Sequence, residues 1–74
     1  MTADITAIIL TNNEEKHLER CINSLKNIIK RIVIIDSFST DATLKILKNH
    51  NVEFYQKEWV NYASQLNWGI EKAN

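Results

Sequence analysis

Polar side chains follow two apolar runs of the sequence at the points where those runs end. Four residues of interest follow each run: Thr11, Asn12, Asn13 and Glu14, then Asp36, Ser37, Ser39 and Asp41. A carboxylate such as that of Asp36 accepts strong, charge-assisted hydrogen bonds. These residue types therefore predict a site for a ligand that offers N–H or O–H donors, such as a base or sugar hydroxyls.

The same segments argue against a backbone cradle for phosphate. Gly69 is the only glycine and lies in a predicted helix, so the sequence has neither a Gly-rich dinucleotide turn nor a P-loop. Glu14 and Glu15 would also repel an anion near the first polar cluster. We therefore expect any phosphates of the ligand to be neutralised elsewhere, by a metal ion.

Three short segments have the composition of β-strands. Residues 5–11 and 31–36 are nearly continuous in β-branched and apolar residues, as in parallel strands that are buried on both faces. Residues 52–56 alternate between apolar and polar side chains, which is typical of a half-exposed strand at the edge of a sheet.

Apolar residues at helical spacing fill the intervals between these strands. The first interval predicts a helix whose apolar stripe consists of Leu18, Cys21, Ile22, Leu25 and Ile29. Asn12 or Asn13 is expected to cap this helix, and Ser39 or Thr40 the second helix. A third helix is expected to begin near Asn61 and to turn five side chains inward: Tyr62, Ala63, Leu66, Ile70 and Ala73.

This alternation predicts an α/β fold, a three-layer β-α-β-α-β-α unit around a parallel sheet. Right-handed crossovers place the strands in the order 3-2-1. Ligands of such sheets bind beyond the carboxyl ends of the strands, where both polar clusters lie. The strand at residues 5–11 would form an apolar edge, so we expect either a covering part of a larger protein or a homo-oligomer through this edge.

Composition excludes several classes of protein. The 74 residues carry nine basic and nine acidic side chains, so a cationic surface for nucleic acid is not expected. Cys21 is the only cysteine, which rules out an intrachain disulfide. The first residues do not read as a signal peptide, and no apolar run is long enough to span a bilayer. We therefore expect a cytoplasmic protein.

A purely structural interpretation of the polar residues stays open. Asp36 could begin a turn, and Ser39, Thr40 and Asp41 could simply start a helix. Glu14 could serve only the helix dipole. Two aromatic residues near the start of the third helix are more often core than ligand contacts in such positions: Trp59 and Tyr62. Composition and spacing alone thus predict an α/β module with an acidic ligand rim.

Three motifs add a resemblance to a known family. "AIILTNNEEKHLERCINSL", "RIVIIDSFSTDATLKIL" and "EWVNYASQLNWGI" occur in this order and together span most of the chain. The sequence resembles the opening of a family 2 glycosyltransferase with the GT-A, Rossmann-like fold. More narrowly, it is similar to bacterial enzymes that add a sugar to the lipopolysaccharide core.

The resemblance implies a nucleotide-sugar donor and a glycan or glycolipid acceptor of the cell envelope. It implies that the segment from Thr11 through Asn13 to Glu14 lines the base and ribose and that Asp36 accepts the base N–H. Gln65 and Asn67 of the third helix would reach the donor as well. Ser39 belongs to the same rim and is included among the expected nucleotide-sugar contacts.

The family's metal-binding Asp-x-Asp and its catalytic base are absent from these 74 residues. By resemblance, residues 1–74 then correspond to the N-terminal, nucleotide-binding part of a longer enzyme. The divalent metal, Mg or Mn, would bind in the full-length enzyme and not to this chain, which we expect to be inactive alone. Attachment to the inner-membrane surface is an alternative location for the full-length enzyme. The alternative function is a non-catalytic module that binds a nucleotide or oligomerises.

Overall fold

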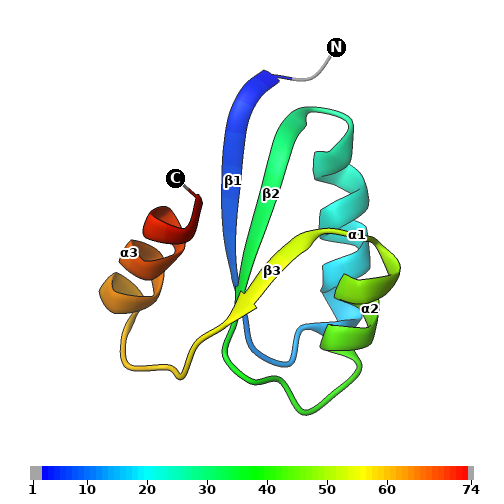
Figure 1. The fold of residues 1–74 in the computed structure, drawn as a ribbon. Helices are drawn as coiled ribbons and strands as arrows, with labels where there is room; N and C mark the ends of the chain where they lie inside the picture. Colours follow the sequence, from blue (N-terminus) through cyan, green and yellow to red (C-terminus); the bar gives the residue numbers. More distant parts are fainter. Residues whose placement is uncertain (1–2, 74) are drawn as a thin grey trace.

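The computed structural model describes residues 3–73, in which three strands alternate with three helices (Figure 1). In chain order these are β1 (Ala3–Thr11), α1 (Glu15–Lys26), β2 (Ile29–Asp36), α2 (Thr43–Asn49), β3 (Glu53–Gln56) and α3 (Tyr62–Ala73). The strands are parallel and lie in the order β1-β2-β3. The predicted strand order, 3-2-1, is confirmed.

The helices cover the two faces of the sheet. Helices α1 and α2 lie together on one face, and α3 lies on the other (Figure 1). Helix α1 contacts β2 and α2, whereas α3 contacts β1 and β2. The predicted three-layer arrangement is therefore confirmed. Among residues 3–73, no helix is long and apolar enough to cross a bilayer.

Strand β2 is the centre of the fold because it has a neighbour on each side. Its side chains alternate between the two faces, as in any strand. Ile32 and Ile34 pack against Leu18, Ile22 and Leu47, all buried, in the main core under α1 and α2. On the opposite face of the sheet, α3 packs very close to β2. A Cβ added at Gly69 of α3 would lie only 3.0 Å from the Cγ1 atom of Ile35.

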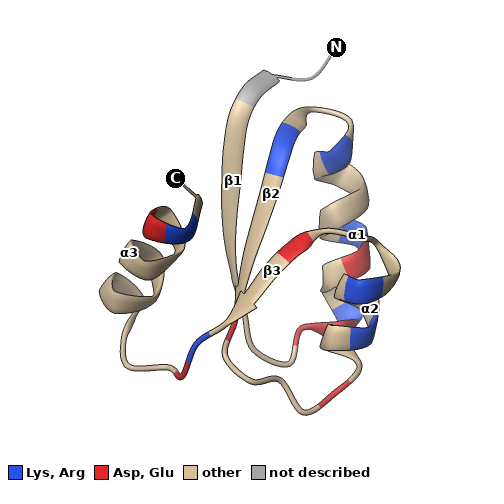
Figure 2. Cartoon of the chain, viewed as in Figure 1, with Lys and Arg blue, Asp and Glu red and all other residues tan. Residues whose placement is uncertain are grey.

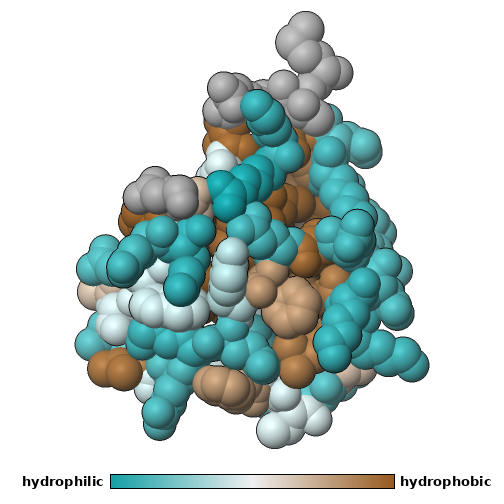
Figure 3. Space-filling view, in the orientation of Figure 1, coloured by the Kyte–Doolittle hydropathy of each residue, from teal (hydrophilic) through white to brown (hydrophobic). Residues whose placement is uncertain are grey.

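Strand β1 is less buried than its sequence predicts. Residues 7–10 are half-buried, and Ile5 is 55% exposed. We expected burial on both faces, but β1 is an edge strand of this sheet, so only one long side of it is paired. Apolar patches also show among hydrophilic side chains on the face in view (Figure 3). Self-association through this edge stays a prediction.

Several helix details differ from the sequence prediction. Ile29 begins β2 instead of extending the first helix, because α1 ends at Lys26. Helix α2 begins at Thr43 and has no side-chain cap from Ala42, its N-cap residue, so the expected caps at Ser39 and Thr40 are wrong. Helix α3 does begin where expected, since Asn61 Oδ1 accepts a hydrogen bond from the Ser64 N–H at 2.8 Å.

Helix α3 turns a different face inward than predicted. Gln65 and Gly69 are its buried residues, whereas Tyr62, Leu66 and Ile70 are 74%, 44% and 45% exposed. The buried side is narrow because α3 approaches β1 and β2 closely at Gly69, where a side chain has no room. Apolar periodicity thus indicated the helix correctly but its inner face wrongly.

Candidate functional site

A hollow of about 350 Å³ lies at the carboxyl ends of β1 and β2, on the side of α3. We call it the rim hollow; its lining residues are Leu10, Thr11, Asn12, Glu14, Ser37, Trp59, Tyr62 and Gln65. None of them is a lysine or arginine. Acidic residues mark the loops at this end of the sheet, while α1 and α2 carry many of the basic ones (Figure 2).

Asp36 ends β2 and is fully buried, with 0% of its surface exposed. Its carboxylate accepts four hydrogen bonds from the chain: Oδ1 from the hydroxyls of Thr11 and Ser39, Oδ2 from the Ser39 N–H and the Gln56 amide. The Thr11 contact is 2.7 Å long and the Ser39 N–H contact 2.8 Å. Since a carboxylate offers about four lone-pair sites, this one is fully used within the protein.

The alternation of β2 explains why Asp36 is not part of the rim hollow. Asp36 follows Ile32 and Ile34 on the face under α1 and α2, whereas Ser37 falls on the face of Ile35 and α3. Ser37 accordingly lines the hollow. A direct contact between Asp36 and a base would require one of its four internal donors to be displaced.

Asn13 and Ser39 join the two loops that follow β1 and β2. The Asn13 N–H donates to Ser39 Oγ at 2.8 Å, and Asn13 Oδ1 accepts from the Thr40 N–H at 2.8 Å. Asn13 has a positive φ of 55°, a conformation that asparagine tolerates better than most residues. The expected cap of α1 at Asn13 is therefore wrong, because its side chain bonds the other loop.

Asp41 of the second loop and Thr43, the first residue of α2, supply the caps of α1 instead. Thr43 Oγ1 accepts a hydrogen bond from the Glu14 N–H at 3.0 Å, and Asp41 Oδ2 accepts one from the Glu15 N–H at 3.3 Å. Burial raises the pKa of Asp41, but hydrogen bonds from Thr43 and Glu15 outweigh it, so the pKa lies below its usual value. The two loops thus hold each other in place around the carboxyl ends of the strands.

Gln65 is the polar residue of α3 that lines the rim hollow, and it is fully buried. Its Nε2 donates to the Lys57 carbonyl at 3.1 Å, which fixes the orientation of the amide. Its Oε1 atom has no hydrogen-bond partner among the described residues. An unpaired buried acceptor costs about 1–3 kcal/mol, so a partner that completes it would be stabilising.

The seven predicted ligand contacts therefore separate into three groups. Thr11, Glu14 and Gln65 line the rim hollow. Another three are hydrogen-bonded to one another in the network that joins the two loops: Asn13, Asp36 and Ser39. The last, Asn67, is exposed on α3 and does not line the hollow.

Five residues of the hollow are not among the seven expected contacts: Leu10, Asn12, Ser37, Trp59 and Tyr62. Asn12 and Ser37 were named in the two polar clusters, and the period of two along β2, which sends neighbouring residues to opposite faces, already indicated Ser37. Trp59 and Tyr62 were expected in the core, but they are 44% and 74% exposed. The sequence carried no signal for this, because their exposure depends on which face α3 turns inward.

A metal site does not fit the described residues. Within residues 3–73, no group of three or more His, Cys, Asp or Glu side chains lies close enough together to hold a metal ion. The buried carboxylate of Asp36 is saturated by hydroxyl, amide and backbone donors.

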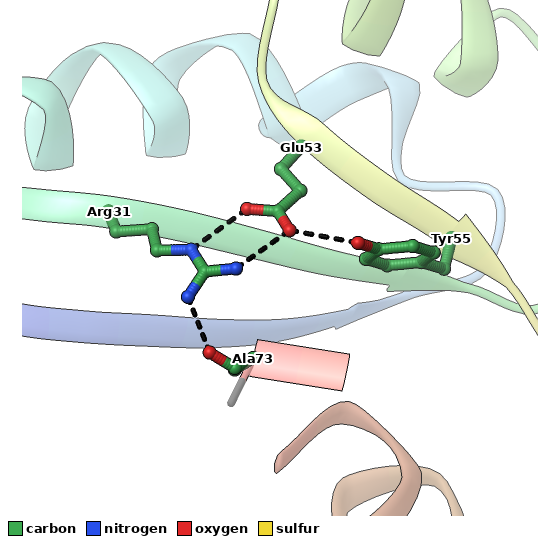
Figure 4. A network of polar contacts seen from close by, with 4 residues as sticks. All are labelled: Arg31, Glu53, Tyr55 and Ala73. Atoms are coloured by element: carbon green, nitrogen blue, oxygen red, sulfur yellow. Dashed lines mark hydrogen bonds and ion pairs between the residues drawn. The ribbon is translucent and has the colours of Figure 1, made fainter. Parts of the chain in front are cut away.

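A second polar network joins β2 and β3 to the end of α3 (Figure 4). Arg31 donates to Glu53 from Nε at 2.9 Å and from Nη2 at 2.8 Å, and Tyr55 donates to Glu53 at 2.9 Å. Hydrogen bonds from Arg31 lower the pKa of Glu53. Arg31 Nη1 also donates to the carbonyl of Ala73, which ties the end of α3 to the sheet.

Comparison with known proteins identifies the family of this chain. The family model described as "Glycosyl transferase family 2" matches residues 6–74. The chain belongs to glycosyl transferase family 2. Its parallel sheet with helices on both faces agrees with the GT-A, Rossmann-like fold of that family.

Curated relatives of this family 2 chain are named glycosyltransferases. An uncharacterized glycosyltransferase of Rickettsia bellii (strain RML369-C) is 40% identical over 65 residues, 88% of this chain and 22% of the relative. Glycosyltransferase SunS of Bacillus phage SPbeta is 39% identical over 62 residues, 81% of this chain and 15% of the relative. Lipopolysaccharide core biosynthesis glycosyltransferase LpsC of Rhizobium meliloti (strain 1021) is 33% identical over 75 residues, which cover 95% of this chain and 27% of the relative. The chain thus spans about a fifth of the length of these relatives.

Proposed function

We propose that this chain holds the nucleoside of a nucleotide-sugar donor in a family 2 glycosyltransferase. The observation that carries the proposal is the unpaired Oε1 of Gln65, a buried acceptor in the wall of the rim hollow. A nucleoside offers the N–H and O–H donors that this acceptor needs. The bond from Nε2 to the Lys57 carbonyl holds the amide in a fixed orientation for such a donor.

The rest of the hollow supports the same class of ligand. The Glu14 carboxylate suits the hydroxyls of a ribose, since charged acceptors form the stronger hydrogen bonds. Without a lysine or arginine in the lining, the hollow favours the uncharged part of the donor over its phosphates. Asp36, Asn13 and Ser39 would act indirectly here, by fixing the loops that carry Thr11 and Glu14.

For the whole enzyme we propose transfer of the sugar to a glycan or glycolipid of the cell envelope. This acceptor class is supported by the printed name of LpsC, a lipopolysaccharide core biosynthesis glycosyltransferase. A cytoplasmic location, at the inner-membrane surface, fits a nucleotide-sugar donor. A divalent metal, Mg or Mn, would be bound by residues of the whole enzyme other than those described here, to neutralise the phosphates.

The test is a titration of the chain with uridine and guanosine diphosphate sugars, followed by amide NMR shifts. We expect saturable shifts at residues of the rim hollow, and Gln65→Leu should weaken binding by roughly 5- to 20-fold through the lost acceptor. Glu71→Ala is the matched control on the same helix, and it should leave the affinity unchanged because Glu71 is exposed and outside the hollow. Shifts confined to other surfaces would contradict the proposal.

A further inference from the structure

The chain contains two edge-to-face aromatic pairs that differ in their surroundings. Tyr55 and Trp68 have ring centroids 6.1 Å apart, and Trp59 and Tyr62 have centroids 5.0 Å apart. Lys72 Nζ lies 4.9 Å from the Trp68 ring centroid and 5.8 Å from that of Tyr55. The first pair is therefore half-buried and already packed against a cation inside the protein.

The second pair faces solvent beside the rim hollow. Trp59 is 44% exposed and Tyr62 is 74% exposed, and both line the hollow. Among residues 3–73, the recorded cation–π contacts involve the other pair and not this one. Two large exposed aromatic rings are costly in water unless something covers them, so this pair is available for a flat partner.

We propose that the Trp59–Tyr62 pair is the stacking wall for the base of the bound nucleoside. The perpendicular rings make a corner: the base stacks on one ring face, and the second ring supports that ring from its edge. Gln65 Oε1 then accepts a hydrogen bond from an N–H at the rim of the same base. This inference rests on the proposed function and adds the residues that recognise the base.

The position of the pair in the chain supports this assignment. Trp59 lies in the segment between β3 and α3, and Tyr62 is the first residue of α3, while Gln65 follows one turn later. Residues three apart on a helix lie on neighbouring parts of one surface. One short segment therefore brings a ring face and an unpaired acceptor to the same hollow, which suits a planar ligand with a donor at its edge.

The experiment uses the two tryptophans as matched reporters. In Trp68→Phe the emission of Trp59 is read alone, and in Trp59→Phe that of Trp68. Uridine and guanosine diphosphate are the probes, and inorganic pyrophosphate and glucose are the controls without a base. We expect both nucleotides to quench Trp59 and to leave Trp68 unchanged, with no effect of either control.

Affinity measured by amide NMR shifts gives the second readout. Trp59→Ala and Tyr62→Ala should each weaken nucleotide binding roughly 5- to 150-fold, the range expected for loss of one stacked base. Trp68→Phe should bind as the unchanged chain does. Circular dichroism checks that each variant is folded, and the conservative Trp59→Phe should retain part of the affinity because it keeps a ring.

The outcomes separate the two proposals. If the unchanged chain binds nucleotide but Trp59→Ala and Tyr62→Ala bind equally well, the stacking wall is wrong while the proposed function stands. Quenching of Trp68 in place of Trp59 overturns the wall in the same way. If no nucleotide shifts any amide at concentrations up to roughly 10 mM, the proposed function fails and the stacking wall falls with it.

Discussion

The two faces of the sheet are made from alternate residues of the same strands, yet they are built very differently. On the side of α1 and α2, Ile32 and Ile34 belong to a closed aliphatic core, and the polar residue at its end, Asp36, is fully paired. On the side of α3, the helix approaches the sheet closely at Gly69, a hollow lies beside its first turn at Tyr62, and Gln65 keeps an unpaired oxygen.

This difference gives the two faces different roles: one holds the structure together, and the other carries the candidate site. Every oxygen of the Asp36 carboxylate is used inside the protein, so the first face can hold the loops but has nothing left to offer a ligand. The second face has the unsatisfied acceptor, the exposed aromatic rings and the free volume. On the function we propose, a polar residue at the end of a strand of this sheet contacts the ligand only when its side chain points to the open face.

Adjacent residues on opposite faces give the largest predicted contrast. Asp36→Asn should lower the free energy of unfolding by about 3 kcal/mol, because a buried amide donor would then face the donors now bonded to the carboxylate. Ser37→Ala should change it by less than about 0.5 kcal/mol, since Ser37 is only half-buried. Urea unfolding followed by circular dichroism measures both.

The same two variants also test the division between scaffold and site. If Asp36→Asn were as stable as the unchanged chain and lost only nucleotide affinity, Asp36 would be a direct ligand contact, as the family resemblance implies. Equal destabilisation by the two substitutions would contradict the difference between the faces.

The closeness of α3 to the sheet predicts a smaller effect. Gly69→Ala should destabilise the fold by roughly 1–2 kcal/mol, because the new Cβ would lie 2.8 Å from Cγ2 of Ile8, a stiff β-branched side chain. This cost must exceed the gain in helix propensity of about 1 kcal/mol that alanine normally brings. Thermal unfolding followed by circular dichroism measures the change.

Asn67→Ala is the control for this substitution, since Asn67 lies on the exposed side of α3. There the propensity gain has no steric cost, so this variant should be slightly more stable than the unchanged chain. A stabilising Gly69→Ala would show that α3 can move away from the sheet, and the hollow would then not have a fixed shape.

The sequence predicted the fold well because strand order follows from alternation and chirality. Residues 31–36 read as a buried strand, and their central position in the sheet is confirmed. Helix ends were less accurate: α2 begins at Thr43 because Ser39 bonds Asp36 and Asn13 instead of capping a helix. The bond between Asn13 and Ser39 joins residues 26 positions apart, which local sequence rules do not address.

The location of the rim hollow was predicted from the sequence, but only some of its lining residues were. Both polar clusters do lie at the carboxyl ends of the strands, and three of the seven expected contacts line the hollow: Thr11, Glu14 and Gln65. Asp36 was chosen for its charge, whereas its place on the alternating strand already pointed it to the core face. The inner face of α3 was not predictable from periodicity, because a small and a polar residue, Gly69 and Gln65, are buried there.

The smallest predicted effect belongs to the ion pair between Arg31 of β2 and Glu53 of β3 (Figure 4). Hydrogen bonds from Arg31 hold the pKa of Glu53 below its usual value of 4.5, so the pair stabilises the fold fully at pH values above that figure. The contribution is lost as the pH falls through the lowered pKa. Since the two side chains are 40% and 33% exposed, water and salt screen the pair and keep this effect well below that of Asp36→Asn.

Glu53→Gln isolates this contribution, because glutamine keeps the shape and cannot ionise. Unfolding of both proteins between pH 7 and pH 3 should show the unchanged chain losing stability toward acid more steeply than the variant, with the difference between them shrinking below the usual carboxyl range. Added salt should reduce the same difference at neutral pH. Parallel pH profiles would mean that Arg31 stabilises α3 through its bond to the Ala73 carbonyl alone, and not through Glu53.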